Sequence, residues 1–338
     1  ACLATAKAEI SASCPRGLPV VVDPFTGSGA IPLEAQRLGL EAHASDLNPV
    51  AVLITKALIE IPPRFAGLPP VNPASQAKLG NAGWRGAQGL AEDVRYYGRW
   101  MRDQAERRIR HLYPKVKLPP EHGGGEATVI AWLWARTVRC PNPACGAEMP
   151  LVRSFALSTK KGKQAWVEPI VDRAAKTVHF TVKTGAGVPP DGTVNRQGAR
   201  CLVCGSSVPF AHVRAEGRAG RMGARLMAIV AEAPRSRIYL PPDDEHVRIA
   251  REATPEWAPD ANLPHNPRDF NTPNYGMTTF ADLFTPRQLV ALTTFSDLVA
   301  EARKRVLRDA EAAIASGAWS SAGVAITQQP NAGASPDG

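Results

Sequence analysis

The chain has 338 residues, of which 44% are hydrophobic and 21% charged, and it contains no apolar run of membrane-spanning length. This composition argues against a membrane protein and predicts a soluble chain of one large or two modest domains. A formal net charge of +9 favours a polyanionic partner such as nucleic acid. Residues 1–13 lack the basic-then-apolar pattern of a secretory signal, so we expect a cytoplasmic protein.

The first predicted elements are a strand, a glycine turn and a helix. Residues 20–30 read Val-Val-Val-Asp-Pro-Phe-Thr-Gly-Ser-Gly-Ala, an apolar run that ends in an acid and a turn. The spacing of apolar residues over 31–38 predicts a helix that stops at Gly39. A short second strand is predicted at 43–45. This succession is typical of a doubly wound α/β sheet.

The glycine turn and its two acids predict a site for a nucleoside cofactor. Gly27 and Gly29 can adopt positive φ and let the backbone approach a ligand. Asp46 follows Asp23 by 23 positions and lies at the carboxyl edge of the second strand, where a carboxylate can accept ribose hydroxyls. The candidate cofactor-binding residues are Asp23, Pro24, Phe25, Gly27, Gly29, Asp46 and Asn48.

Charge separates two kinds of cofactor for this turn. A dinucleotide fingerprint has a third glycine, where this chain has Pro32, and it places a pyrophosphate on the helix N-terminus. Asp23 would repel a phosphate but attract an ammonium group. S-adenosylmethionine carries an amino group and a sulfonium but no phosphate, so it is the favoured cofactor. A glycine turn without a ligand is the alternative.

A long amphipathic helix is predicted over residues 90–113, with Pro114 after its end. Its outer face is basic, and its aromatic side chains are better explained as core than as platforms for nucleic-acid bases.

From the glycine turn and this helix we assign two regions. Residues 1–60 are interpreted as the half of a domain that binds S-adenosylmethionine, and residues 61–130 as a helical connection.

Four of the six cysteines form two closely spaced pairs, each followed by glycine. They are Cys140, Cys145, Cys201 and Cys204. Four thiolates in two short turns suit tetrahedral Zn²⁺, and four sulfur ligands leave no position for water, so we expect a structural site. The 55 residues between the pairs contain strand-like segments at 165–170 and 177–182, which predict an inserted hairpin. Residues 131–230 are interpreted as a zinc-ribbon insertion.

Two other interpretations of the cysteines are weaker. Disulfide bonds are the poorer interpretation in a cytosolic chain, and unliganded core cysteines are the remaining alternative. Cys2 and Cys14 fit neither spacing and are expected to be free thiols.

Basic side chains flank both cysteine pairs and also lie next to the first strand of the predicted hairpin. Such a cluster can neutralise phosphates and position a nucleic acid without reading its sequence, and a solvated loop face is the alternative. We expect contact with DNA, with RNA as an open alternative. The residues are Lys160, Lys161, Lys163, Arg214, Arg218 and Arg221, with Arg136, Arg139, Arg153 and Arg225 beside them.

The last third of the chain predicts two irregular loops, one helix and a tail. Residues 239–245 and 255–274 are rich in proline and are interpreted as loops. Thr285-Pro-Arg-Gln is a capping box that begins a long helix. Residues 231–315 are assigned to these loops and a helix that returns to the core, and residues 316–338 to a disordered tail.

These residues together resemble a known family. The motifs that begin at Asp23 and Asp46 resemble the first two motifs of amino-methylating, adenine-specific DNA methyltransferases. With residues 90–114, the cysteine pairs and residues 283–289, the chain resembles the bacterial and archaeal adenine-specific DNA methylases that contain a Zn-ribbon, from about Leu18 to about Arg308.

The resemblance implies a Rossmann-like methyltransferase sheet with an inserted zinc ribbon and flanking helices. It implies transfer of a methyl group from S-adenosylmethionine to the exocyclic amine of adenine, with Asp23 holding the methionine amine and Asp46 the ribose. The family's Asp/Asn/Ser-Pro-Pro-aromatic motif does not occur. Every Pro-Pro pair has the wrong neighbours, at positions 62, 69, 119, 189 and 241.

We therefore expect an incomplete sheet and a truncated member of the family, with no catalytic residue identified in this chain. Ala1, which is not an initiator methionine, also suggests processing or a fragment. A non-catalytic, zinc-stabilised module that binds nucleic acid is the alternative, as is an RNA methyltransferase.

Overall fold

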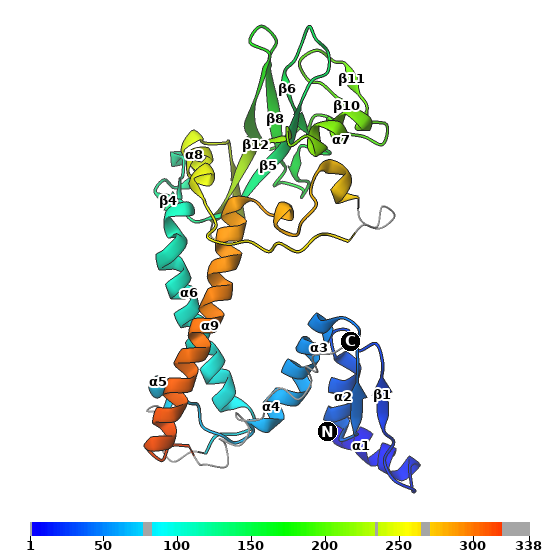
Figure 1. Cartoon of the computed structure of the whole chain (residues 1–338), viewed down its shortest axis with the longest axis vertical. Helices are drawn as coiled ribbons and strands as arrows, with labels where there is room; N and C mark the ends of the chain where they lie inside the picture. The colour runs from blue at the N-terminus through cyan, green and yellow to red at the C-terminus, as the bar shows by residue number, and fades with distance from the viewer. Residues whose placement is uncertain (1, 77–82, 234–235, 265–270, 320–338) are drawn as a thin grey trace. The chain divides into compact units, whose positions relative to one another are not determined.

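The computed structural model describes residues 2–76, 83–233, 236–264 and 271–319. It is a mixed α/β protein with several small sheets and two long helices (Figure 1), so the α/β class is confirmed in this coarse form. The chain divides into two compact units, one of Ala1–Asp103 with Leu298–Gly338 and one of Gln104–Asp297. Within the described ranges no helix has the length and apolarity needed to cross a membrane.

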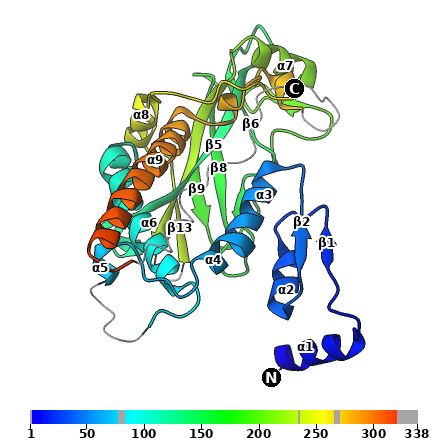
Figure 2. The same ribbon diagram turned by 60° about the horizontal axis from the view of Figure 1, so that its bottom comes forward.

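The first unit begins with a helix and a parallel pair of strands. Helix α1 (Cys2–Ser13) precedes β1 (Val21–Asp23), α2 (Ala30–Leu38) and β2 (Ala42–Ala44). The strands pair in parallel, with Asp23 opposite Ala44 (Figure 2). Gly39 ends α2 in the left-handed region at φ 81°, as expected for a C-terminal glycine. The predicted order of strand, turn, helix and strand is confirmed, and in the described residues this parallel sheet has two strands.

A run of helix follows β2 and was not predicted. It consists of α3 (Pro49–Thr55), the π-helical η1 (Lys56–Glu60) and α4 (Ile61–Arg64). Asn48 caps it, because its Oδ1 accepts the amide of Val50 at 3.0 Å and Pro49 occupies the first helical position. Helix α5 (Pro73–Gln76) comes next.

The long helices were predicted close to their observed bounds. Helix α6 spans Gln88–Ile109 and continues into the 3₁₀ turn η2 (Arg110–Leu112), while α9 spans Pro286–Ala315. The capping box at the start of α9 is confirmed, since Gln288 N donates to Thr285 Oγ1 at 3.3 Å and Thr285 N donates to Gln288 Oε1 at 2.8 Å.

In the first unit, α6 and α9 are joined by buried aromatic residues. Tyr97 Oη donates to Asp309 Oδ2 at 2.8 Å, and Arg305 Nη2 donates to Tyr96 Oη at 3.0 Å. Tyr97 packs with Val71 and residues of the last turns of α9 in one apolar cluster. The aromatic side chains of α6 were expected to lie in the core. Tyr97 is one of them, and it is buried.

The second unit is built on antiparallel sheets. The largest has the order β13-β12-β5-β6, and a second has the order β7-β8-β9. The predicted hairpin between the cysteine pairs is confirmed as β8 and β9. The strands are β3 (Val116–Lys117), β4 (Glu126–Ala127), β5 (Val129–Arg139), β6 (Glu148–Leu151), β7 (Ala156–Ser158), β8 (Ala165–Asp172), β9 (Thr177–Thr184), β10 (Ala199–Arg200), β11 (Ser207–Val208), β12 (Gly223–Ala233) and β13 (Ser236–Leu240).

Short helices complete the second unit and correct one prediction. Residues 239–245 were expected to form a loop, but β13 runs to Leu240 and α8 (Asp244–Glu252) begins after Asp243, whose side chain accepts the amide of Glu245 at 2.8 Å. The acids of the supposed loop are therefore a helix cap and first turn, where carboxylates are favoured. The other helices are η3 (Pro120–His122), α7 (Phe210–Arg218), η4 (Thr272–Tyr275) and η5 (Ala281–Leu283).

Two predictions fall partly or largely outside the described residues. The expected loop at 255–274 includes 265–270, and the expected disordered tail at 316–338 includes 320–338, which lie beyond the described part of the chain. The described residues 255–264 are irregular apart from a bend at Glu256 and an isolated bridge between Asn262 and Thr279, and η4 begins at Thr272.

A buried cluster of aromatic and cationic side chains anchors α8 and the start of α9 in the second unit. The Arg287 guanidinium lies 3.9 Å from the centroid of the Trp132 ring and is 7% exposed. Trp132 Nε1 donates to His246 Nδ1 at 2.8 Å. Because an indole nitrogen can only donate, this contact requires an unprotonated Nδ1, and burial lowers the pKa of His246 below its ordinary 6.5.

This cluster predicts an acid-sensitive contribution of His246 to stability. A histidine whose pKa is lowered by folding stabilises the protein fully above the unfolded pKa and less as pH falls below it. Between about pH 7.5 and about pH 5.5 we expect the free energy of urea unfolding to fall more in wild type than in His246→Asn, by up to about 1 kcal/mol, because asparagine keeps an acceptor that does not titrate. Equal losses in both proteins would contradict this assignment.

Candidate metal centre and cofactor turn

The first cysteine pair lies in the turn between β5 and β6. Cys140 N donates to the carbonyl of Ala147 at 2.8 Å and closes the base of the turn. The amides of Cys145 and Gly146 both bind the carbonyl of Asn142, at 2.9 and 3.0 Å. Gly146 adopts φ 60°, a conformation that other residues rarely take. The glycine after the second cysteine therefore lets the chain turn back into β6.

The second cysteine pair repeats this arrangement between β10 and β11. Cys201 N donates to the carbonyl of Ser206 at 3.0 Å, and Gly205 N donates to the carbonyl of Cys201 at 2.9 Å. Gly205 has φ 76°. Each pair thus lies at the tip of a short antiparallel hairpin, and the side chains of each pair extend from one tight turn.

The structure brings the four predicted ligands together. All four sulfur atoms lie within 4.8 Å of one another, with Cys140 Sγ 3.7 Å from Cys204 Sγ and Cys145 Sγ 3.9 Å from Cys201 Sγ. Tetrahedral zinc with Zn–S bonds of about 2.3 Å requires sulfur atoms about 3.8 Å apart, whereas a disulfide requires about 2.05 Å. The cluster could therefore bind a metal ion, and its geometry and donor set suit zinc.

The surroundings of the sulfurs differ from one cysteine to the next. Burial raises the pKa of Cys140 to about 12, whereas hydrogen bonds with the side chain and the backbone of Ser206 lower the pKa of Cys204 to about 6. Beside the first cysteine pair, Lys176 Nζ donates to the carbonyl of Ala144, the residue before Cys145, at 2.8 Å. Three of the four cysteines are buried. A bound cation would displace the thiol protons, and four sulfur ligands would leave no site for water, so the geometry fits a structural metal.

Asp46 connects the two turns that follow β1 and β2. Its Oδ2 accepts the amide of Gly27 at 2.9 Å, and its Oδ1 accepts the amide of Asn48 at 2.8 Å. These two amides, Asn48 first, lower the pKa of Asp46, so the carboxylate is ionised at neutral pH. Gly27 and Gly29 have φ of 51° and 78°, as expected for the glycine turn.

The other predicted cofactor residues differ in burial and in their hydrogen bonds. Asp23 is buried at 8% exposure, and its Oδ1 accepts the amide of Phe25 at 3.2 Å. The Phe25 side chain is 82% exposed beside the turn. Asn48 is the helix cap of α3, and Pro24 is exposed. The structure thus brings Asp23, Asp46 and the glycine turn to one edge of the parallel strands.

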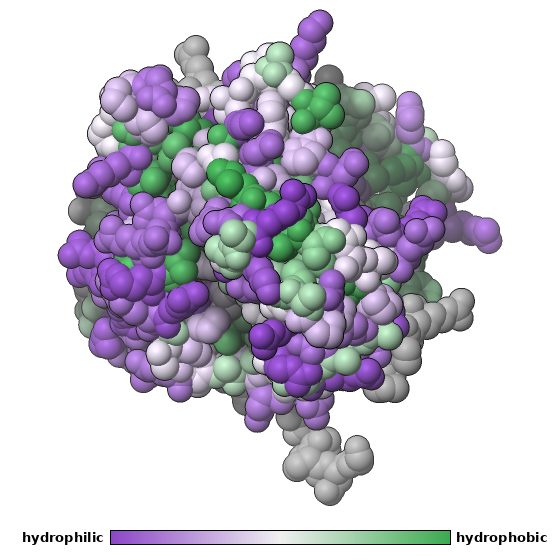
Figure 3. All heavy atoms as spheres, turned by 90° about the horizontal axis from the view of Figure 1, so that it is seen from above, coloured by the Kyte–Doolittle hydropathy of each residue, from purple (hydrophilic) through white to green (hydrophobic). Residues whose placement is uncertain are grey.

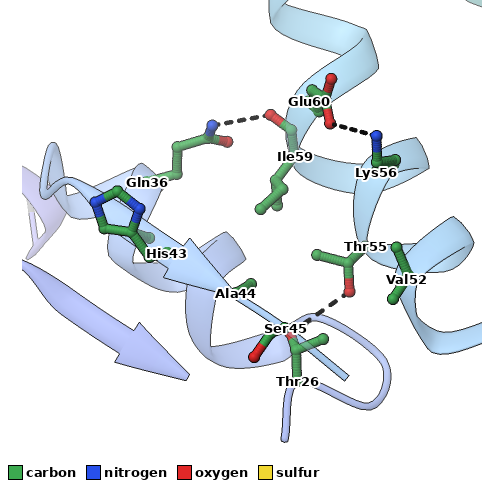
Figure 4. A pocket seen from close by; sticks show the side chains of 11 residues that line it. Thr26, Gln36, His43, Ala44, Ser45, Val52, Thr55, Lys56, Ile59 and Glu60 are labelled. Carbon is green, nitrogen blue, oxygen red and sulfur yellow. Dashed lines mark hydrogen bonds and ion pairs between the residues drawn. The ribbon is translucent and has the colours of Figure 1, made fainter. Parts of the chain in front are cut away.

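A cavity of about 340 Å³ is lined by residues of α2, β2, α3 and η1, and none of the seven predicted cofactor residues lines it. Figure 4 shows Gln36 reaching Ile59, whose carbonyl accepts from Gln36 Nε2 at 2.9 Å in the π-helical segment. Thr26 and Thr55 face each other at 3.5 Å between their hydroxyl oxygens. The cavity is lined by Thr26, Gln36, Ala42, His43, Ala44, Ser45, Val52, Thr55, Lys56, Ile59 and Glu60.

The sequence interpretation missed Thr55, which approaches the glycine turn. A Cβ at Gly29 would lie 3.0 Å from Thr55 Oγ1 and 3.4 Å from Thr55 Cα. Gly29 therefore makes room for α3 as well as for the turn. A glycine in such a turn signals a close approach, but the approaching residue becomes known only from the packing.

Some of the basic side chains predicted to bind nucleic acid contact an acidic or aromatic side chain, and others form no ion pair. Arg221 binds Glu216, with Nη2 2.6 Å from Oε1, and Arg225 binds Glu148 at 2.7 Å. The Arg214 guanidinium lies 5.8 Å from the centroid of the Tyr275 ring. Among the residues described, Lys160, Lys161, Lys163 and Arg218 have no ion pair.

Comparisons with protein-family models, with curated proteins and with solved structures find no match for this chain. The fold and site by themselves define a mixed α/β protein with a four-cysteine cluster that could hold a metal ion.

The cluster predicts that metal removal destabilises the second unit. We expect about one zinc per chain in protein purified without oxygen. Cys145→Ser should lose most of the metal and unfold at a lower temperature, because three cluster cysteines belong to the largest buried core of this unit. Cys14→Ser, a thiol change in the first unit, is the matched control and should keep the metal. Metal analysis and thermal unfolding measure both; equal zinc content in the two variants would refute the assignment.

Proposed function

We propose that the chain is the cofactor-binding, zinc-stabilised part of an S-adenosylmethionine-dependent methyltransferase that acts on the exocyclic amine of adenine in DNA. The observation that carries the proposal is the connection made by Asp46, which binds the amides of Gly27 and Asn48. Each carboxylate oxygen has two lone pairs, so an Asp46 fixed in this way can also accept the two hydroxyls of a ribose.

The charge of the turn supports a cofactor without phosphate. Asp23 is the last residue of β1 and Asp46 follows the adjacent parallel strand β2, and residues 17–36 contain no lysine or arginine. A diphosphate would meet two acids and no cationic side chain from this segment. The amino and sulfonium groups of S-adenosylmethionine carry the opposite charge, and the exposed ring of Phe25 is available to stack on an adenine.

The cysteine cluster and its basic neighbours support a nucleic-acid partner. Two hairpin tips that each supply two thiolates are the plan of a zinc ribbon, which we propose for this module. Hydrophilic side chains cover much of the face drawn in Figure 3, with apolar side chains in smaller areas between them. Arg218, which has no ion pair with a described residue, is proposed to contact DNA phosphates.

Methyl transfer itself needs groups that we do not identify in this chain. In the family that the motifs resemble, an Asp/Asn/Ser-Pro-Pro-aromatic motif holds the adenine amine, and no such motif occurs in the 338 residues. We therefore propose cofactor binding for this chain and assign no catalytic residue.

A second candidate is a zinc-stabilised nucleic-acid-binding module without a cofactor. The burial of Asp23 favours this candidate, because its Oδ1 is already bound to the amide of Phe25. It differs from the first proposal in one measurable property, the binding of S-adenosylmethionine.

Calorimetry with S-adenosylmethionine tests the proposal. We expect saturable binding to the full zinc-loaded chain and an affinity at least about tenfold lower in Asp46→Ala, which removes a charged hydrogen-bond acceptor. Glu34→Gln removes an exposed acid on α2 that pairs with Arg37 and should leave the affinity unchanged. Unchanged far-UV circular dichroism and thermal unfolding of both variants control for folding of the first unit. No heat with wild type, while DNA still binds, would favour the second candidate.

A further inference from the structure

The second unit contains a larger cavity that the proposed cofactor site does not involve. Its volume is about 890 Å³, and it lies where the loop between β7 and β8 meets the ends of β9 and β13. This volume is in the range of small-molecule sites, about 300–1,000 Å³. Residues from four separate segments line it, among them His122, Lys160, Lys163 and Arg237.

The cavity has a one-sided charge. Lys160, Lys163 and Arg237 are cationic, and among the residues that the structure describes no aspartate or glutamate lines the cavity. Glu232, which stands opposite Arg237 in the ladder of β12 and β13, is not part of the lining. Concave sites with charges of one sign concentrate counter-ions, so this cavity attracts anions.

The three cations are free to bind a ligand. Some basic side chains elsewhere in the unit are paired, for example Lys183 with Glu168 at 4.0 Å and Arg221 with Glu216 at 2.6 Å. No ion pair joins Lys160, Lys163 or Arg237 to any residue of the described ranges.

The loop that carries the two lysines has a defined shape. Lys163 N donates to the carbonyl of Lys160 at 2.8 Å, which closes a turn with Gly162 at φ 73°. Gly185 N donates to the carbonyl of Gln164 at 3.0 Å and ties the end of the loop to the end of β9. Hydroxyl groups of Ser158 and Ser236 line the same cavity and can add neutral donors.

We propose that this cavity binds the phosphates of a small polyphosphate ligand of the nucleoside triphosphate class. Three cations can each bind one phosphate group of a triphosphate and offset most of its negative charge, and hydroxyl donors can add hydrogen bonds. A cavity of this size suits a small molecule better than a duplex, whose phosphates are distributed along an extended surface. The inference does not depend on S-adenosylmethionine binding, because the residues belong to a different unit.

Calorimetry on the zinc-loaded full chain, with inorganic tripolyphosphate and ATP as probes, tests the proposal. We expect saturable binding with one site, weakened by salt. The affinity should fall by about tenfold for each cation removed, and so by about a hundredfold in Lys160→Gln/Lys163→Gln. Arg237→Gln, on another element, should give a loss of about tenfold.

Lys161→Gln is the matched control. It removes the same charge from the same loop, but Lys161 does not line the cavity, so its affinity should stay within about twofold of wild type. Equal losses in Lys161→Gln and the double variant would show a general charge effect and overturn the proposal. Absence of saturable binding to both probes would overturn it as well. A single-stranded oligonucleotide that binds through Lys160 and Lys163 when neither probe binds would replace the small ligand with a nucleic-acid strand.

Discussion

The approach of four cysteine sulfurs to within 4.8 Å of one another is the constraint on which the second unit depends. Two hairpin tips separated by 55 residues must meet, and the intervening β7, β8 and β9 must form a sheet that returns the chain to the second tip. Closing such a loop costs conformational entropy, and three buried thiols and one exposed thiol offset little of it by themselves. A metal ion bound by all four thiolates would supply the missing free energy. Cys140, Cys145 and Cys201 belong to the same core as Met149, Phe155 and Val208.

Local signals predicted some elements well. The glycine turn, the stop at Gly39 and the capping box at Thr285 each depend on the conformation or hydrogen bonding of a few neighbouring residues, so the sequence specifies them directly. The cysteine spacing predicted a cluster that the structure assembles. The long central strands β5 and β12 were not recognised, because a buried strand gives a continuous apolar run that periodicity cannot distinguish from a helix. The basic cavity also escaped prediction, since Arg237 joins Lys160 and Lys163 only through the pairing of β12 with β13 and the return of β9. The acids at 243–245 were assigned to a loop because proline precedes them, yet they cap α8.

The two units carry different chemistry. In the first, acidic side chains lie at or just after the ends of both parallel strands, and Asp46 holds the two turns together through backbone amides. The second contains the cluster of four cysteine sulfurs and a cavity whose described lining has three cations and no acidic side chain. This division is the physical basis for proposing a cationic, phosphate-free cofactor for the first unit and phosphate-bearing ligands for the second. The proposals are separable, because a change at Asp46 leaves the charges of the cavity untouched.

X-ray absorption at the zinc edge tests the central claim most directly, because it counts the ligands and measures their distances in the intact chain. The account predicts a single shell of four sulfur atoms at about 2.3 Å, with no oxygen or nitrogen ligand. A shell containing oxygen or nitrogen, or a zinc-free protein whose four cysteines are oxidised to disulfides, would contradict it.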